Sequence, residues 1–410
     1  MTLDYANQNN SQILILKSSI KRLSLRSMQS TKTIGIIGGG QLGKMFIENA
    51  SKTSAKINIL DRDKNCPASN LAHKHIVGSI TDAEEIQKLS DISDMLTWEI
   101  EHINVDKLIE LQQQGKTIIP NPEILKIIQD KGKQKTFYKE NNIPTSAFFI
   151  ADNKEEAIEK LAQTNFKKVA VKASTGGYDG KGVFIAETNS ILNKDVEIPF
   201  DGALMIEEFI PCKKELAVLV ARDIHGNNAV YPAIEMEFTE GNLVSFLISP
   251  ANIDSSIEQK TQEIAIQCAD AFNSAGLFAV EFFLSENDEI LVNEIAPRPH
   301  NSAHHTIEGF YTSQYEQLLR VLLDKPLGST EMIAPCAMVN IVGAENGAGK
   351  YQLKYEKELM QMKGVFIHLY GKAESKPNRK LGHVTIVNPD RNELIKLAEK
   401  VRTLVAIEIV

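Results

Sequence analysis

The 410-residue chain has few cysteines, no long apolar run and no excess of positive charge. The four cysteines stand far apart without a CxxC pair: Cys66, Cys212, Cys268 and Cys336. This spacing argues against a disulfide scaffold and predicts reduced thiols in a cytosolic protein. Because a membrane helix needs ~20 consecutive apolar residues, we expect no membrane partner. The net charge of −8 argues against a bulk nucleic-acid binder, although local basic spots can hold small phosphates.

Residues 1–31 differ in composition from the rest of the chain. Their apolar run, Ile13–Leu16, is too short for the core of a signal peptide. Basic residues and serines resemble a transit peptide weakly, but Asp4 and the Gln/Asn-rich start weaken that interpretation. We interpret this segment as a disordered tail, or as the product of a start codon placed upstream of Met28. The remaining length allows two or three domains with a large core.

An alternation of strands and helices opens the main part of the chain. Residues 33–37 and 57–60 are typical of buried strands, with a helix between them at 44–54. The first strand runs into Gly38-Gly39-Gly40-Gln41-Leu42-Gly43, which fits the G-x-G-x-x-G pattern. We therefore predict a Rossmann-like domain over residues 32–125. Alone, the pattern is weak evidence, because a tight turn at a helix N-terminus can hold any phosphate.

A second glycine-rich loop follows a strand that ends on a lysine. The strand at 169–172 ends at Lys172, and the loop has glycines at 176, 177, 180 and 182 with Lys181 among them. Such a loop can wrap phosphates with backbone N–H groups. It is not a Walker A loop, because Gly182 rather than Ser or Thr follows the lysine. A flexible hairpin tip is the alternative, and Lys172 argues against it.

Three further features, two between these loops and one after the second, carry polar groups. The strand at 94–99 delivers Glu99 to its carboxyl end, where ligands bind in open α/β sheets. A helix is predicted over 123–142, and its charge cluster around Lys131 is typical of a solvated face. The strand at 204–211 leaves into an extended segment, whose backbone can read an adenine edge while Glu215 takes ribose hydroxyls.

Two strands with facing acids predict a metal site. Residues 278–284 and 290–295 are apolar runs separated by a turn, so a hairpin places Glu281 almost opposite Asn293 and Glu294. Two buried carboxylates repel unless a cation lies between them. Oxygen ligands favour Mg²⁺, especially Mg²⁺ shared with phosphates. The alternative is that Glu281 points to solvent from an edge strand.

The chain then stiffens into a loop that carries catalytic residue types. Pro297 and Pro299 fix two φ angles and end the strand, and Arg298, His300 and Asn301 follow within a few positions. Further on, Pro326-Leu327-Gly328-Ser329 marks a boundary, and we predict a mixed α/β region over 326–410. This region has a basic loop at 370–383 that is either an anion-binding loop or a solvated hairpin.

The order of these parts resembles the ATP-grasp superfamily. Within it, five motifs resemble the 5-(carboxyamino)imidazole ribonucleotide synthase family: Gly38–Gly43, Trp98–His102, Gly177–Gly182, Asn293–Ser302 and Arg379–His383. The resemblance covers residues 32 to 410. It implies an α/β (α+β overall) enzyme with a Rossmann-like domain (32–125), an ATP-grasp domain (126–325) and a C-terminal domain that binds the substrate phosphate (326–410).

The resemblance also implies roles for individual residues. For ATP, the residues are Lys131, Lys172, Gly176, Gly177, Tyr178, Asp179, Gly180, Lys181, Gly182, Glu207, Glu208, Phe209, Ile210, Glu215, Asn293 and Glu294. The metal ligands are Glu281 and Glu294, and the catalytic group is Arg298, His300, Asn301, Tyr178 and Lys181. The ribonucleotide would contact Gln41, Leu42, Glu99, Tyr178, Lys181, Arg298, Lys372, Arg379 and Lys380.

The implied reaction is the ATP- and bicarbonate-dependent carboxylation of 5-aminoimidazole ribonucleotide (AIR) in purine biosynthesis, through carboxyphosphate and with Mg²⁺ or Mn²⁺. A cytoplasmic homodimer is implied as well. Two departures weaken single contacts: the family often has His where Phe238 lies, and Lys131 stands where some relatives carry Arg.

Three rival functions remain open on the sequence alone. The first is a formate-dependent glycinamide ribonucleotide transformylase, which shares a Pro-Arg-Pro-His segment but is expected to continue with Asp-Thr rather than Asn301-Ser302. The second is an NAD oxidoreductase, suggested by the first glycine turn and Asp61. The third is a non-catalytic nucleotide-binding protein, which the intact acid pair and Arg298 disfavour.

Overall fold

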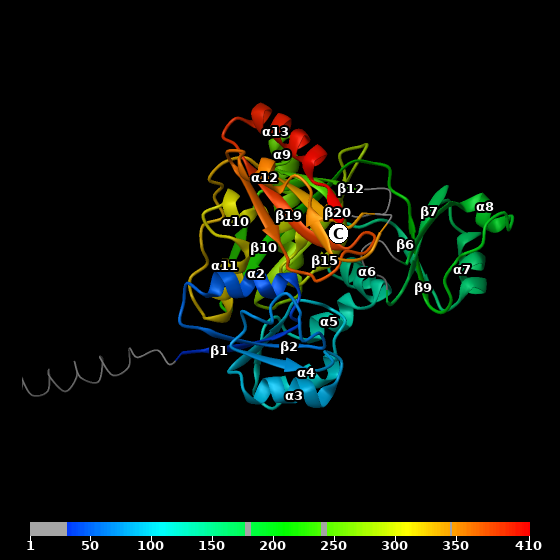
Figure 1. Cartoon of the computed structure of the whole chain (residues 1–410). Coiled ribbons are helices and arrows are strands. Elements are labelled where there is room, and N and C mark those ends of the chain that lie inside the picture. The colour runs from blue at the N-terminus through cyan, green and yellow to red at the C-terminus, as the bar shows by residue number, and fades with distance from the viewer. Residues whose placement is uncertain (1–30, 177–181, 239–243, 345–346) are drawn as a thin grey trace, which may run out of the picture.

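The computed structural model of the chain describes residues 31–176, 182–238, 244–344 and 347–410. Figure 1 shows a lower body formed by the first strands, an upper body that holds most of the later chain, and a smaller lobe that projects to the right. This is the mixed α/β architecture that the alternating patterns predict. Within the described ranges, every helix is too short or too polar to span a lipid bilayer.

The lower body is a parallel five-stranded sheet in the order β3-β2-β1-β4-β5. Its strands are β1 (Thr33–Ile37), β2 (Lys56–Asp61), β3 (Lys74–Val77), β4 (Met95–Trp98) and β5 (Thr117–Ile118). Its helices are α2 (Gln41–Ala50), α3 (Ala83–Asp91) and α4 (Val105–Gln113). Helices α3 and α4 share one apolar cluster with the sheet, whereas α2 packs in another that reaches the upper body. The Rossmann-like opening is confirmed.

The bounds predicted for the first helix are wrong. We expect residues 44–54 from the sequence, but α2 begins at Gln41 and ends at Ala50. The early start has a physical cause: the carboxylate of Glu99, just after β4, accepts hydrogen bonds from the backbone N–H groups of Gly40 and Gly43. An acid from a neighbouring strand thus satisfies donors that the first turn of a helix leaves open.

The single helix predicted over residues 123–142 is also wrong. The chain forms α5 (Glu123–Ile128) and α6 (Lys131–Glu140) with a break between them. Asp130 has an extended backbone and its side chain accepts from the N–H of Lys133 at 3.1 Å, so it caps a new helix. The break places Lys131 at the start of α6, where its N–H donates to the carbonyl of Ser174 at 2.8 Å.

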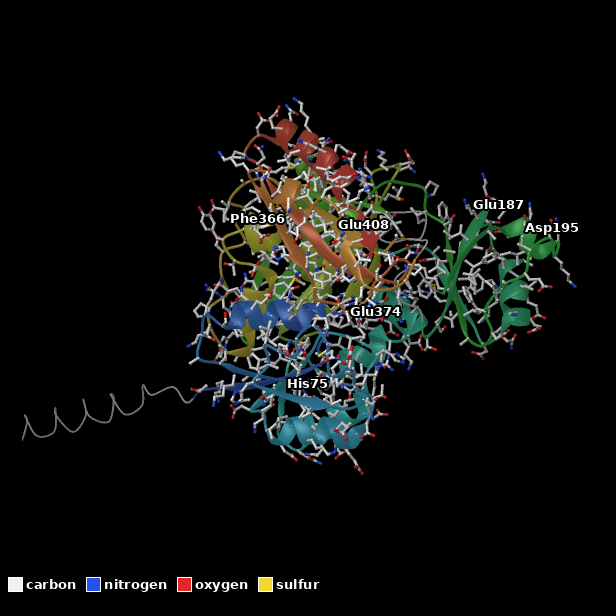
Figure 2. All side chains as sticks on the ribbon, viewed as in Figure 1. His75, Glu187, Asp195, Phe366, Glu374 and Glu408 are labelled. Atoms are coloured by element: carbon white, nitrogen blue, oxygen red, sulfur yellow. The ribbon has the colours of Figure 1, made fainter. Side chains whose placement is uncertain are left out.

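The projecting lobe contains an antiparallel four-stranded sheet in the order β6-β9-β7-β8. The strands are β6 (Phe148–Ala151), β7 (Lys168–Ala173), β8 (Val183–Glu187) and β9 (Leu204–Glu208), accompanied by α7 (Lys154–Leu161) and α8 (Thr188–Leu192). Figure 2 shows the exposed side chains of Glu187 and Asp195 on the outer end of this lobe. Lys172 on β7 and Glu207 and Glu208 on β9 are residues that the sequence predicts to contact ATP.

A nine-stranded antiparallel sheet forms the upper body, in the order β15-β14-β10-β12-β13-β16-β19-β18 with β11 paired to β10. The central strands are β10 (Cys212–Arg222), β11 (Asn228–Val230), β12 (Ile234–Phe238), β13 (Val244–Ser249), β14 (Gly276–Ser285) and β15 (Ile290–Ala296). The C-terminal strands are β16 (Cys336–Val342), β18 (Val365–Leu369) and β19 (Lys380–Val387). Because β13 pairs with β16, the C-terminal region extends the same sheet.

The remaining elements cover this sheet or close its ends. The helices are α9 (Ser255–Ala271), the short η1 (Asn301–Ala303), α10 (Thr306–Gly309), α11 (Gln314–Leu322), α12 (Glu356–Met360) and α13 (Arg391–Leu404). A small separate ladder joins β17 (Tyr351–Leu353) to β20 (Ile407–Ile409). The last helix, α13, ends at Leu404, shortly before β20 begins at Ile407.

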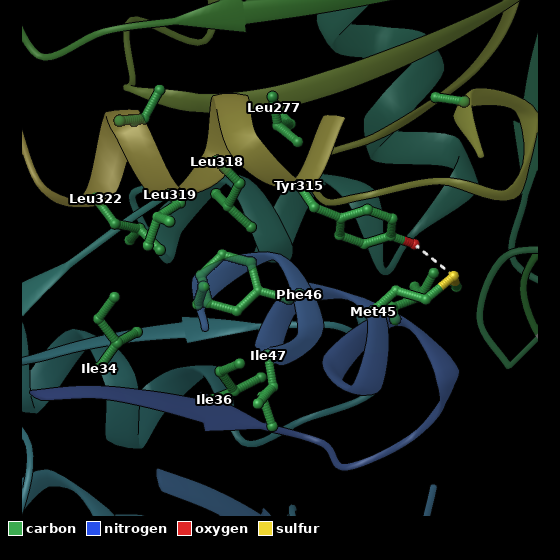
Figure 3. Close-up of a cluster of buried hydrophobic side chains, with 14 of the residues drawn as sticks. Ile34, Ile36, Met45, Phe46, Ile47, Leu277, Tyr315, Leu318, Leu319 and Leu322 are labelled. Carbon is green, nitrogen blue, oxygen red and sulfur yellow. Dashed lines mark hydrogen bonds between the residues drawn. The ribbon is translucent and has the colours of Figure 1, made fainter. Parts of the chain in front are cut away.

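An apolar interface between α2 and α11 joins the lower and upper bodies. Figure 3 shows Phe46 of α2 lying between Leu318 of α11 and Ile47, and the Tyr315 hydroxyl directed at the sulfur of Met45. That O···S distance is 3.6 Å. Fully burying a side chain such as phenylalanine or leucine contributes about 1.5–3 kcal/mol. The interface therefore holds the first glycine turn in a fixed position relative to β14 and β15.

Candidate active site

The hairpin of β14 and β15 brings the two predicted metal ligands together. Glu281 is the direct cross-strand partner of Glu294, and the register shifts by one residue between Glu281 and Phe282. This bulge leaves Asn293 as an extra residue on β15, and the amide oxygen of Asn293 accepts from Lys172 Nζ at 3.3 Å. The alternative of a solvent-facing Glu281 is wrong, because β14 lies between β10 and β15 and the Glu281 side chain is 12% exposed.

The two carboxylates have opposite pKa shifts. Lys131 Nζ lies 3.1 Å from Glu294 Oε2 and holds the pKa of Glu294 below its usual range despite burial. Burial and the negative charge of Glu294 raise the pKa of Glu281, while Lys380 and Lys131 oppose that rise. The acid pair is therefore short of positive charge on the Glu281 side, which is the electrostatic condition that a bound divalent cation would correct.

The donor set fits Mg²⁺ held jointly with phosphates. Two facing carboxylates and a neighbouring amide supply oxygen ligands, and Mg²⁺ is commonly bound by one or two carboxylates plus phosphates and water. Among the described residues, no group of three or more His, Cys, Asp and Glu side chains converges as a metal site. The protein part of this shell is thus suited to a nucleotide-bound metal rather than to a closed structural site.

A buried ion network supports Lys172. The carboxylate of Glu207 bridges Lys172 and Lys135, at 2.7 Å from Lys135 Nζ, and accepts from Ser146 Oγ at 2.6 Å. Although burial opposes it, the two lysines hold the pKa of Glu207 far below its usual range. Glu207 is 2% exposed, so its side chain faces the lysines within the sheet. The sequence-based interpretation of residues 130–135 as a solvated face missed Lys135.

The rest of the predicted nucleotide hinge lies at the end of β9 and the start of β10. Glu208 is half-buried, and the ring of Phe209 lies 4.5 Å from Lys168 Nζ. The N–H of Phe209 donates to the carbonyl of Lys168 at 2.9 Å, which continues the sheet into the segment containing Ile210. Burial raises the pKa of Glu215 to about 7, with Lys172 opposing the rise.

The second glycine loop joins β7 to β8. Gly176 and Gly182 flank it with positive φ angles of 82° and 86°, a conformation that side chains with a Cβ rarely adopt. Five predicted site residues, Gly177, Tyr178, Asp179, Gly180 and Lys181, lie outside the described residues. The flanking strands pair as a hairpin, with Lys172 opposite Val183, so both ends of the loop are fixed beside Lys172.

The proline-stiffened segment lies beside the acid pair. Arg298 Nε lies 2.6 Å from Glu101 Oε1, which comes from the loop after β4 in the lower body. His300 Nδ1 lies 3.9 Å from Glu281 Oε1 and 2.9 Å from Ser302 Oγ. The Asn301 amide makes two reciprocal 2.9 Å hydrogen bonds with the amide of Asn340. Glu101 and Asn340 are partners that sequence reasoning missed, because they are far away in the chain.

Glu99 fills the turn where a dinucleotide would place its pyrophosphate. Its carboxylate accepts from Gly40 and Gly43, and burial raises its pKa to about 7 even though these donors and Arg298 oppose the rise. A Cβ on Gly40 would lie 2.7 Å from Glu99 Oε1, so glycine is needed there for close approach. This internal anion occupies the helix terminus and argues against the NAD alternative.

The predicted phosphate-binding residues lie on the loop before β19 and at its first position. Lys372 Nζ lies 5.8 Å from the ring centroid of Tyr370, and Arg379 donates to the carbonyl of Glu374 at 2.8 Å. Lys380 begins β19 and is close enough to Glu281 to lower its pKa. At the first glycine turn, Gln41 and Leu42 begin α2, with Leu42 buried.

Comparisons with known proteins match three domain families in the same order. Residues 31–129 match the ribonucleotide synthetase preATP-grasp domain, and residues 136–315 match the ATP-grasp domain. Residues 336–397 match the phosphoribosylaminoimidazole carboxylase C-terminal domain. These matches span most of the described chain and agree with the three-part architecture.

The chain is also similar to named relatives. It is 34% identical to N5-carboxyaminoimidazole ribonucleotide synthase from Bacillus subtilis, covering 88% of this chain and 93% of that protein. It is 39% identical to the chloroplastic phosphoribosylaminoimidazole carboxylase from Vigna aconitifolia, covering 86% of this chain but 64% of that longer protein. A solved structure of N5-carboxyaminoimidazole synthase from Aspergillus clavatus, in complex with ADP and 5-aminoimidazole ribonucleotide, superposes with a TM-score of 0.83, 31% identity and coverage of 92% and 99%.

Proposed function

The chain belongs to the N5-carboxyaminoimidazole ribonucleotide synthase family of ATP-grasp enzymes, and from this premise we propose that it uses ATP and bicarbonate to carboxylate AIR in purine biosynthesis. The observation that carries the proposal is the meeting of Glu281, Glu294, Lys131 and His300 around one hairpin. That arrangement is suited to phosphoryl transfer from ATP to a small acid. The enzyme is an ADP-forming ligase.

ATP contacts are assigned to groups on both sides of the lobe junction. Lys131 and Lys172, each held by an acid, bind phosphate oxygens, and the backbone N–H groups of the glycine loop are assigned to the same phosphates. The backbone of the segment from Glu208 to Ile210 takes the adenine edge, and Glu215 takes the ribose. Glu207 supports these ATP contacts, because its carboxylate forms an ion pair with Lys172.

Glu281 and Glu294, with the Asn293 amide beside them, would hold Mg²⁺, with Mn²⁺ as a substitute. When bound, the ion supplies positive charge that stabilises the phosphoryl oxygens. Lys131 and Lys172 contribute to the same stabilisation, because each is a cation held in place by an acid, Glu294 and Glu207 respectively. Phosphoryl transfer depends mainly on such positioning and charge, so little covalent chemistry is required of the protein.

The first chemical step transfers the γ-phosphoryl group to an oxygen of bicarbonate and gives ADP and carboxyphosphate. Arg298, held by Glu101, binds the bicarbonate, while His300 and Asn301 orient it. Carboxyphosphate then breaks its carbon–oxygen bond to phosphate and releases CO₂ in place. Tyr178 and Lys181 on the glycine loop are assigned to contacts with the bicarbonate and AIR, and the site must exclude water, which would otherwise destroy the intermediate.

The second step joins CO₂ to the amine of AIR. The amine nitrogen forms the new carbon–nitrogen bond and gives up one proton. Glu99 lies at the carboxyl end of β4 with a pKa of about 7, so it is suited to accept that proton. Gln41 and Leu42 contact the ribonucleotide near Glu99, and Lys372, Arg379 and Lys380 hold its 5′-phosphate.

An ADP-release assay tests the reaction directly. ADP should form at the full rate when AIR, bicarbonate and Mg²⁺ are all present, and omission of any one should lower the rate by at least about 10-fold. Replacing bicarbonate with formate, and AIR with glycinamide ribonucleotide, tests the transformylase alternative. Faster turnover with that second pair would overturn the proposal.

We further assign the working enzyme to the cytoplasm and to a homodimer. Widely separated cysteines, two of them fully buried, suit a reducing compartment. Sedimentation of the purified full chain would test the dimer, and a monomer at micromolar concentration would contradict it.

A further inference from the structure

The side-chain amide of Gln314 makes hydrogen bonds with both the backbone N–H and the backbone carbonyl of His300, as a neighbouring strand would. The N–H of His300 donates to Gln314 Oε1 at 2.8 Å, and Gln314 Nε2 donates to the carbonyl of His300 at 3.0 Å. Gln314 is the first residue of α11, and its side chain is completely buried. Because a backbone N–H can act only as a donor and a carbonyl only as an acceptor, these two bonds fix the orientation of the amide.

We call these two hydrogen bonds the Gln314 clamp. Further buried partners hold the Gln314 side chain in place. Gln314 Nε2 lies 2.9 Å from His304 Nδ1, and the Tyr315 hydroxyl lies 3.2 Å from the same nitrogen. Since the amide orientation makes Nε2 a donor, His304 Nδ1 is an acceptor. The N–H of Gln314 donates to Thr306 Oγ1 at 2.9 Å. Buried partners therefore fix the orientation of the Gln314 amide, and the backbone of His300 is hydrogen-bonded to a side chain that is itself held in place.

His300 needs such a support because its segment has left the sheet. β15 ends at Ala296, and His300 has an extended backbone at φ −127° and ψ 153°. Among the described residues, no strand pairs with His300. Hydrogen bonds to both the backbone N–H and the backbone carbonyl of His300 fix the direction in which its side chain leaves the backbone. The Gln314 clamp acts two residues after Arg298 and one before Asn301.

We propose that Gln314 is a positioning residue that sets the orientation of the Arg298–His300–Asn301 segment for the carboxyphosphate step. The inference rests on the proposed function of that segment. Displacement of a reacting group by 1 Å can cost about 100-fold in rate. A displaced segment would also hold carboxyphosphate badly, so ATP would be spent without carboxylation of AIR.

The same helix offers a matched control. One turn later, Gln317 is equally buried and makes the same two-bond clamp on Gly328, with its Nε2 2.8 Å from the carbonyl and its Oε1 2.9 Å from the N–H. Gly328 is not a proposed site residue. Changing either glutamine to glutamate places a carboxylate against a carbonyl in a buried position, so both changes should cost comparable stability.

The experiment compares Gln314→Glu, Gln317→Glu and the milder Gln314→Met with the parent enzyme. ADP release and carboxylated product are measured together with kcat, KM for AIR and thermal unfolding. Both Gln314 variants should lower kcat about 10- to 100-fold and release more than one ADP per product. Gln317→Glu should unfold at a lower temperature yet keep one ADP per product.

Two outcomes would overturn the inference. Folded Gln314→Met with parental kcat and parental coupling would show that the clamp does not position the segment. Equal losses of activity in Gln314→Glu and Gln317→Glu, with unchanged coupling, would reduce Gln314 to a structural residue. Failure of the proposed function is distinguishable, because the parent enzyme itself would then show no ADP release that depends on AIR and bicarbonate.

Discussion

Near the hairpin of β14 and β15, the lysines assigned to ATP are paired with acids, whereas the acid Glu281 has a raised pKa. Lys131 pairs with Glu294 and Lys172 with Glu207, so both lysines assigned to ATP already have acidic partners, of which Glu207 is buried. Glu281 is the member of the acid pair whose pKa is raised, since burial and Glu294 outweigh the nearby lysines. It therefore gains most from an arriving cation and costs most while that cation is absent.

Replacing Glu281 with glutamine should separate stability from activity. Glu281→Gln removes a buried carboxylate next to Glu294, so thermal unfolding without nucleotide should occur at the same temperature or a higher one. The same change removes a proposed Mg²⁺ ligand, so kcat should fall about 100- to 1000-fold. Glu286→Gln, on the exposed hairpin turn, is the control and should change neither. A Glu281→Gln enzyme with parental kcat would exclude Glu281 as a ligand.

Contacts within the site could be predicted from the sequence where the two residues lie on consecutive elements of the chain. Glu281 and Glu294 belong to consecutive strands, so a turn between them was enough to predict their contact. Glu101, Asn340 and Gln314 come from other elements, and their contacts depend on how those elements pack. Lys135 lies in a recognised charge cluster, but the burial of one face of α6 by Glu207 and Ser146 has no local sequence signal.

The elements differ from prediction mainly at their ends, where long-range contacts compete with local pattern. α2 starts early because Glu99, 59 residues from Gly40, accepts its first donors. The break between α5 and α6 had a local signal that the dense charge pattern concealed. Asp130 is a favoured N-cap residue, and its side chain accepts from the N–H of Lys133 three residues later. The bulge at Asn293 had no local sequence signal, because it depends on the register between two strands.

Removing the cap at this break should weaken both the helix and the ATP site. Asp130→Ala loses the hydrogen bond to Lys133, which should lower the free energy of unfolding by about 1 kcal/mol. Lys131 is the next residue, so the KM for ATP should rise as well. Asp254→Ala is a matched control, because Asp254 precedes α9 without a capping hydrogen bond. Urea unfolding and ATP kinetics check both, and equal stability losses in the two variants would contradict the assignment.

At the scale of the whole molecule, one sheet and one helix interface join the three sequence regions. Pairing of β13 with β16 makes the C-terminal strands continuous with the ATP-binding strands. Packing of α2 against α11 brings the first glycine turn to the same centre. The order of domains was predictable from motif order, whereas this continuity was not, because pairing between β13 and β16 spans some 90 intervening positions of the chain.

Buried imidazoles at this junction should make the folded state sensitive to acid. Burial holds the pKa values of His304 and His383 well below the usual 6.5, and it lowers that of His305 to about 4. The groups around them include the Tyr315 and Tyr370 hydroxyls, the Gln314 amide, the ring of Phe310, and His368 with its partner Glu308. His300 and Lys380 also act to lower the pKa of His304. The folded state therefore stays neutral at these rings while the unfolded chain takes up protons below about pH 6.5.

The sign follows from proton binding: the unfolded state binds more protons, so stability falls as the pH falls from about 6.5 toward 4. His305→Leu removes one such ring, which packs against Phe310. The loss of unfolding free energy between pH 7.5 and 5.5 should therefore be about 1.3 kcal/mol smaller in this variant than in the parent. Urea unfolding at both pH values measures it, with His225→Leu as the control because that side chain is 65% exposed. An unchanged pH dependence in His305→Leu would mean that this ring takes up its proton in the folded protein as readily as in the unfolded chain.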